Sequence, residues 1–153
     1  MKEWYVVSDR KTLLGTGAVG FFAGVLTWLL SMGVEKYFVE PVFCNNADSF
    51  TACANGGTIA FDIALVLIGI LGVVGLVKVS GYRPLLVVLA AVATLWSANQ
   101  WLGVLSWWEA TLWLGLLMGL SYLVYSWLCR LLSFPISIAA VIVLVVLARL
   151  VVA

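Results

Sequence analysis

The stretch "TIAFDIALVLIGILGVVGLV" (residues 58–77) decides the fold class of this chain. It carries a single charged residue, Asp62, and it has the length of about 20 residues that a helix needs to cross the hydrocarbon core of a bilayer. The composition of the whole chain agrees: of its 153 residues, 65% are hydrophobic and only 10% are charged, against about 25% charged in ordinary soluble domains. The sequence therefore predicts an all-α integral membrane protein.

Four further stretches resemble the first in length and apolar character, so residues 1–153 are predicted to form one transmembrane domain, a bundle of five helices. The five spans cover about 12–34, 58–77, 84–105, 110–129 and 133–152. Pro84 and Pro135 fall in first helical turns, where the missing N–H of proline costs no hydrogen bond. Residues 35–57 form the one long connector, which we call the cysteine loop. The boundary between the fourth and fifth spans is the least sharply marked.

The distribution of Lys and Arg predicts the orientation, because cytoplasmic loops carry an excess of these residues. With the N-terminus inside, most of them fall on the cytoplasmic side: Lys2, Arg10, Lys11, Lys78, Arg83 and Arg130. Only Lys36 and Arg149 fall outside. We therefore expect a cytoplasmic N-terminus, an outside C-terminus and a periplasmic or extracellular cysteine loop, in a plasma membrane or bacterial inner membrane.

The residue inventory excludes several kinds of chemistry. The chain has no histidine, which removes bis-His haem ligation and histidine metal sites. Its three cysteines are too few for a four-cysteine zinc site, and no lysine lies in the middle of a span. A net charge of +1 gives no reason to expect nucleic acid binding. We therefore predict no metal, no cofactor and no catalytic residue.

The cysteine loop contains Cys44 and Cys53, which are predicted to form a disulfide. An oxidising compartment lets such a bond persist, and closing this short loop stabilises the fold by about 2–3 kcal/mol. A redox-active pair and two free thiols are the alternatives. The redox interpretation lacks the C-x-x-C spacing typical of exchange-ready pairs, and Cys129 falls at the opposite side of the membrane.

Asp62 is the main candidate for a binding site, because ionisable residues within membrane helices are functional candidates. Counting 1.5 Å per residue from the turn near position 81 places Asp62 at the depth of Asn99 and Gln100. We predict that Asp62 contacts Gln100 or Asn99, with Trp96 and Trp101 close by. Three interpretations stay open: interhelical hydrogen bonding, a ligand or ion site, and a boundary carboxylate stabilised by the helix N-terminus.

Two small-xxx-small motifs, Gly20 with Gly24 and Gly115 with Gly119, are typical of close helix packing. We expect them to pack inside the bundle; a seam between two copies of the chain is the alternative. Tryptophans at the predicted outer boundary, among them Trp107 and Trp108, are typical of an interfacial belt.

The absence of a catalytic motif favours a non-enzymatic function. The leading hypothesis is an accessory, assembly or scaffold subunit that binds a membrane partner. The second is a small oligomeric channel or carrier with a polar site at Asp62, Asn99 and Gln100. The third is a redox or lipid-modifying enzyme. The expected partners are the lipid bilayer and either another membrane protein or further copies of the chain.

Overall fold

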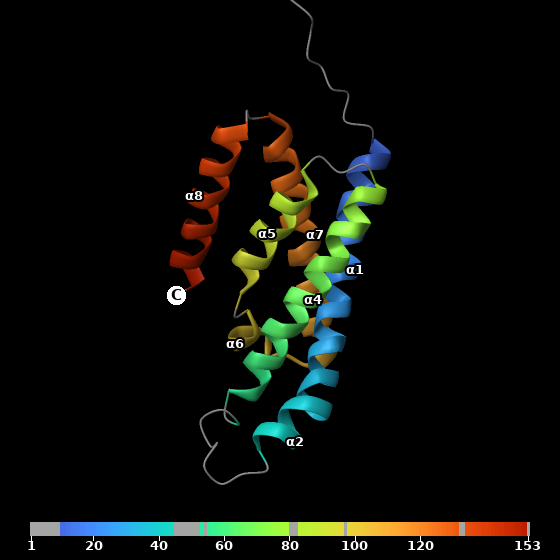
Figure 1. Ribbon diagram of the computed structural model, residues 1–153, viewed down its shortest axis with the longest axis vertical. Helices are drawn as coiled ribbons and strands as arrows, with labels where there is room; N and C mark the ends of the chain where they lie inside the picture. The colour runs from blue at the N-terminus through green and yellow to red at the C-terminus, as the bar shows by residue number, and fades with distance from the viewer. Residues whose placement is uncertain are drawn as a thin grey trace, which may run out of the picture.

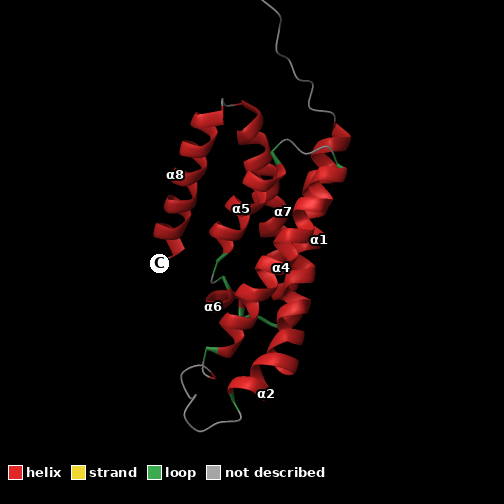
Figure 2. Cartoon of the chain, in the orientation of Figure 1, coloured by secondary structure: helices red, strands yellow, loops and turns green. Residues whose placement is uncertain are grey.

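The computed structural model describes residues 10–44, 53, 55–79, 83–96, 98–131 and 134–152. Every element in these ranges is a helix (Figures 1 and 2). In chain order they are α1 (Arg10–Val34), the π-helical turn η1 (Glu35–Val39), α2 (Glu40–Phe43), α4 (Gly56–Lys78), α5 (Pro84–Leu95), α6 (Asn99–Leu102), α7 (Trp107–Leu131) and α8 (Phe134–Val152). The all-helical prediction is confirmed for this part of the chain.

Three of these helical segments are long and apolar enough to cross a membrane. They are Lys11–Val42, which joins α1 to α2, then Gly56–Lys78 and Trp107–Arg130. The segments Pro84–Leu95 and Pro135–Ala148 are apolar but shorter. Large apolar side chains stand exposed along the outside of the bundle, among them Leu14, Ile70 and Leu150. Such a surface is the one expected of a protein surrounded by lipid.

Helices α1 and α7 are antiparallel and touch through their glycines. A Cβ added to Gly24 would lie 2.5 Å from the carbonyl oxygen of Leu114 and 2.7 Å from the Cα of Gly115. One added to Gly20 would lie 2.9 Å from the Cα of Gly119. The two backbones therefore leave no room for a side chain between them. The prediction that both small-xxx-small motifs pack inside the chain is confirmed.

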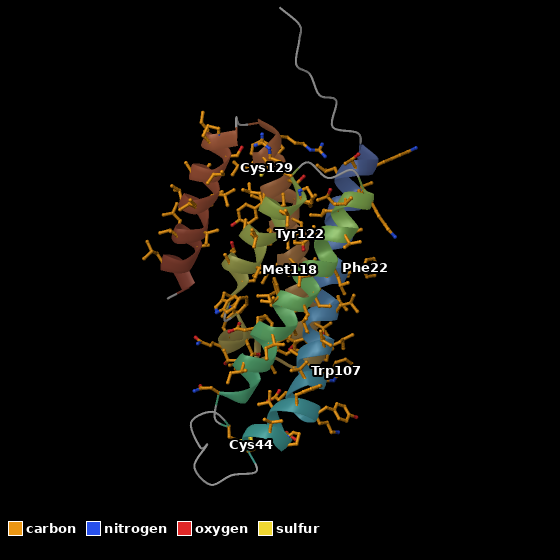
Figure 3. The ribbon with its side chains drawn as sticks, in the orientation of Figure 1. Phe22, Cys44, Trp107, Met118, Tyr122 and Cys129 are labelled. Atoms are coloured by element: carbon orange, nitrogen blue, oxygen red, sulfur yellow. A yellow bond between two sulfur atoms is a disulfide. The ribbon has the colours of Figure 1, made fainter. Side chains whose placement is uncertain are left out.

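Helix α4 completes a three-helix core with α1 and α7. Gly75 of α4 faces Val19 of α1: a Cβ added to Gly75 would lie 2.9 Å from Cγ1 of Val19. The interior is filled by fully buried large side chains, which include Phe61, Leu65 and Leu76 of α4 and Leu114, Met118 and Tyr122 of α7. Figure 3 shows Met118 and Tyr122 about halfway along the bundle.

The helix that begins with α1 continues beyond the predicted end of the first span. Residues 35–43 were predicted to open the cysteine loop, and this is wrong: η1 and α2 carry the helix on to Phe43. Pro41 lies in the first turn of α2. In a regular α-helix its ring would clash with the carbonyl four residues earlier, and the wider π turn directly before it relieves that crowding.

The prediction of one continuous helix over 84–105 is also wrong. Helix α5 ends at Leu95, where Trp96 leaves the helical region with ψ 129°, and the short α6 begins only at Asn99. The next helix starts at Trp107 instead of 110, because Ser106 and Glu109 form a cap: the Ser106 N–H and hydroxyl both donate to Glu109 Oε2, at 3.2 and 2.6 Å. This "SWWE" sequence has the spacing of a capping box.

Helix α8 stands at the edge of the bundle, where it contacts α5 and α7 (Figure 1). The two ends of the bundle differ in charge. The basic end carries Lys11, Lys78, Arg83 and Arg130. The disulfide end carries the Cys44–Cys53 bond, Glu35 and the start of α7.

Candidate functional site

The disulfide predicted from the sequence lies at the disulfide end of the bundle. Cys44 and Cys53 are bonded, with an S–S distance of 2.11 Å and Cα atoms 5.1 Å apart, so the predicted pairing is confirmed. The bond ties the end of α2 to the chain just before α4. The third cysteine, Cys129, is buried near the end of α7, at the basic end (Figure 3). It lies far from the disulfide and is therefore not placed to exchange with it.

Two polar side chains approach the start of α4 near the disulfide end. A Cβ added to Gly57, in the first turn of α4, would lie 3.3 Å from Asn99 Nδ2 and 3.3 Å from Glu35 Oε1. A side chain at position 57 would displace the ends of Glu35 and Asn99, which come from η1 and α6, by a few tenths of an ångström. The Glu35 carboxylate and the Asn99 amide therefore both lie next to α4 at position 57. Glu35 was not among the predicted site residues, since it was expected to lie in a loop.

The predicted candidates lie on α4 and α6 near Gly57. Asp62 is half-buried in the second turn of α4 and takes part in a polar interaction. Asn99 lies beside Gly57, and Gly57 precedes Asp62 by five positions in α4. Gln100 is exposed on α6. Elements α4 and α6 are in contact, as the depth argument required. The specific contact of Asp62 with Gln100 or Asn99 stays a prediction.

The two predicted tryptophans lie on either side of the helix break. Trp96 ends α5 and is 38% exposed, and Trp101 lies in α6 and is 40% exposed. The more deeply buried indole is Trp28 of α1, which meets Phe61 edge-on with ring centroids 6.2 Å apart. Phe61 directly precedes Asp62, so this aromatic pair fixes the part of α4 that carries the carboxylate. Its two rings lie too far apart in the sequence for any local pattern to reveal the contact.

Hydroxyl groups inside the bundle mostly find partners. Thr94 Oγ1 donates to the carbonyl of Ala90, and the hydroxyls of Thr94 and Tyr125 lie 2.6 Å apart, which links α5 to α7 just before the break. Tyr122 differs: its Oη is buried against Gly72 of α4 with no hydrogen-bond partner among the described residues.

Two of the hollows in the described surface bear on the function. The first, which we call the tryptophan surface, is lined by Trp108, Glu109, Leu112, Trp113 and Leu116 at the start of α7 and has a volume of about 310 Å³. Its two indoles are each 52% exposed.

The second hollow, which we call the α5–α8 groove, has a volume of about 250 Å³. It is lined by Leu86, Leu89, Ala90 and Ala93 of α5 and by the face of α8 between Ile138 and Val146. All of its lining residues are apolar, so the groove can bind hydrocarbon but offers no polar group to orient a reaction.

No metal centre is present in the described ranges, where no three residues among His, Cys, Asp and Glu gather closely enough to hold an ion. Comparison with protein-family models, with curated proteins and with solved structures finds no match for this chain.

Proposed function

We propose that this chain is a non-enzymatic accessory or scaffold subunit that binds a membrane partner through its lipid-facing surface. The observation that carries this proposal is the difference between the closely packed interior of the bundle and its exposed apolar exterior. Inside, the three-helix core is closed by glycine contacts, and its hydroxyls at Thr16, Thr27 and Ser31 bond to carbonyls of their own helix. Outside, bulky apolar and aromatic side chains stand exposed. A protein built this way acts through its surface.

The proposal includes five crossings of a plasma membrane or bacterial inner membrane. Helices α1, α4 and α7 would each cross it, α5 with α6 would form a fourth, interrupted crossing, and α8 the fifth. The charges support a cytoplasmic N-terminus and basic end. The disulfide end would then face the periplasm or the exterior, where an oxidising environment maintains the Cys44–Cys53 bond.

The tryptophan surface is the proposed contact for the partner. Exposed tryptophans are enriched among the residues that dominate binding energy, and here two of them flank a hollow that a partner side chain could fill. The same residues also suit the headgroup level of a bilayer, so the experiment must separate a protein partner from lipid.

A photo-crosslinking amino acid placed at Trp108 or Trp113 in native membranes provides this test. Under the proposal, both positions yield the same adduct with one protein of defined mass, and Trp108→Ala weakens the adduct formed at position 113. The matched control is position 127, because Trp127 is exposed to a similar degree near the basic end of the same helix. Adducts with lipid alone, or the same set of proteins at all three positions, would contradict the proposal.

A channel or carrier is the second candidate, and the break after Leu95 favours it. Interrupted helices line the substrate and ion sites of many transporters, and here the break lies beside the first turns of α4, which carry Asp62. A flux assay in proteoliposomes tests this function: flux of a small ion that Asp62→Asn abolishes would support it. No flux for common ions, together with a loss of thermal stability in Asp62→Ala, would assign the carboxylate to helix packing.

A further inference from the structure

We propose that the tryptophan surface binds an arginine side chain of the partner, held by the Glu109 carboxylate and by the rings of Trp108 and Trp113. This inference rests on the accessory function proposed above and adds to it the chemistry of the partner. The arginine belongs to the end of a transmembrane helix of the partner, which lies alongside α7.

The hollow of the tryptophan surface has a negatively charged lining. Among the described residues that line it, Glu109 alone is charged. Its carboxylate accepts two hydrogen bonds from Ser106, both at Oε2, and Oε1 accepts none from the described part of the chain. The positive end of α7 offsets about half a unit of charge, so the full charge of the carboxylate keeps the hollow negative. A cationic group complements this lining.

Two indole rings accompany this carboxylate. Trp108 and Trp113 both line the hollow, and each is 52% exposed, so each ring has surface that a partner can contact. The face of an indole attracts a cation within about 6 Å of the ring centre, more strongly than the ring of tyrosine or phenylalanine does. Arginine uses both features, because its planar guanidinium stacks on an aromatic ring while its N–H groups donate to a carboxylate. The compact, strongly hydrated ammonium of lysine does not stack in this way.

The position of the hollow along α7 suits the end of a membrane helix. Glu109 lies in the first turn of α7, and Trp107, with which α7 begins, lies in the same half of the bundle as Cys44 (Figure 3). From Glu109, the apolar residues Leu112 and Leu116 extend the lining along the helix by about 10 Å. A partner helix with an arginine at its end and an apolar segment beyond it matches this order, because an arginine near a helix end keeps its charged group at the membrane surface.

A phospholipid headgroup matches the hollow less well than an arginine does. The ammonium of such a headgroup is joined to a phosphate, and no basic side chain lines the hollow. A phosphate brought here would therefore lie near the Glu109 carboxylate without a positive partner, and juxtaposed like charges weaken binding. An arginine side chain brings the positive charge without an attached anion. The lining thus favours a protein partner over a phospholipid.

The decisive variant is Glu109→Gln, tested in the full chain with an aromatic photo-crosslinking amino acid at position 113 in native membranes. Glutamine retains an oxygen that can cap the helix but removes the charge. We expect the yield of the protein adduct to fall about fivefold, the loss that corresponds to one ion pair at the surface. Ser106→Ala is the matched control, because it weakens the cap and retains the charge. Glu40→Gln is a second control, because Glu40 lines a different hollow. Both controls should leave the yield unchanged.

A second pair of variants keeps the proposal testable if the changes at the cap prevent folding. With the crosslinker at position 108, Trp113→Phe retains an aromatic face and should retain most of the adduct. Trp113→Leu retains only the apolar bulk and should lower the yield about threefold, as the loss of a cation–π contact predicts. Equal yields from the two variants would overturn the proposal, because they would show that no cation lies on this ring.

The crosslinked peptide identifies the residue of the partner, and we expect an arginine at the end of a transmembrane segment. Replacing that arginine by glutamine should lower the yield in the unaltered chain but not further in Glu109→Gln, because both changes remove the same contact. A protein adduct that Glu109→Gln does not weaken would overturn this inference and leave the accessory function standing. Adducts with phospholipid alone at positions 108 and 113 would contradict both.

Discussion

The α1–α7 contact and the α5–α8 contact are two pairs of apolar helices that differ in how closely their backbones approach. Between α1 and α7, glycines face each other, and an added Cβ at Gly24 would already meet backbone atoms at 2.5 Å. Between α5 and α8, leucines face β-branched side chains such as Val145, and a groove of about 250 Å³ stays open. Lipid tails are as apolar as either helix, so apolar character alone does not drive helices together in a membrane. Small residues on both partners decide which pair closes.

The largest expected effect comes from breaking the close contact. Gly24→Ala should destabilise the protein by about 3 kcal/mol, because the new methyl group meets backbone that cannot rotate away. Thermal unfolding in detergent measures this loss. The matched control is Gly33→Ala in the same helix, where nothing lies within 4 Å of the added Cβ and the change should stabilise by about 0.5–1 kcal/mol. Similar effects at both positions would mean that α1 and α7 do not touch through their glycines.

The second effect concerns the Cys44–Cys53 disulfide, which joins the end of α2 to the chain just before α4. Replacing Cys44 and Cys53 together by Ser should cost about 2–3 kcal/mol, because the unfolded chain regains the freedom of the open loop. Reductant should lower the unfolding free energy of the unaltered protein by a similar amount, which appears as a lower unfolding temperature. It should leave the double variant unaffected. A variant as stable as the parent would show that the helical packing alone holds α2 to the start of α4.

A smaller effect separates two tyrosines of α7. Tyr125→Phe removes the 2.6 Å hydroxyl contact with Thr94 and should cost about 0.6–1 kcal/mol, the range for hydrogen bonds between membrane helices. Tyr122→Phe removes a buried hydroxyl with no described partner and should be neutral or slightly stabilising. Unfolding of both variants, compared under identical detergent conditions, gives the difference. A greater loss for Tyr122→Phe would reveal a partner for its hydroxyl.

The smallest effect is expected at the open contact. Ala93→Leu, measured on lipid-free protein, should change the unfolding free energy by less than about 0.5 kcal/mol, because the groove can take the added atoms. It is a small-to-large change like Gly24→Ala, so the two together measure the difference between the contacts. A loss comparable to that of Gly24→Ala would show that α5 and α8 close on each other in solution.

Several features were predictable because they depend on local chemistry. Long apolar runs predicted the helices, and proline marked the start of α5 at Pro84. The spacing of Cys44 and Cys53 predicted their bond, which the structure contains. The glycine spacings predicted close packing, although only the structure shows that the two motifs face each other.

The two helix boundaries that were predicted wrongly also have physical explanations. The segment around Trp96 is apolar enough to read as one helix, yet it contains Ser97 and Asn99, whose side chains compete for backbone hydrogen bonds and favour helix ends. The continuation of α1 through η1 was missed because Glu35, Lys36 and Glu40 are too polar for a membrane span. A helix can nevertheless extend beyond the hydrocarbon core, since its backbone hydrogen bonds are internal to it.

The sequence by itself determined that the described chain is helical and which two cysteines pair, because these depend on apolar length and short chain closure. The tertiary structure alone decided which faces meet. It placed Gly24 against Gly115, brought Glu35 and Asn99 to Gly57, and left the groove between α5 and α8 open. These outcomes depend on how closely two backbones approach, and that distance is set by pairs of residues far apart in the chain.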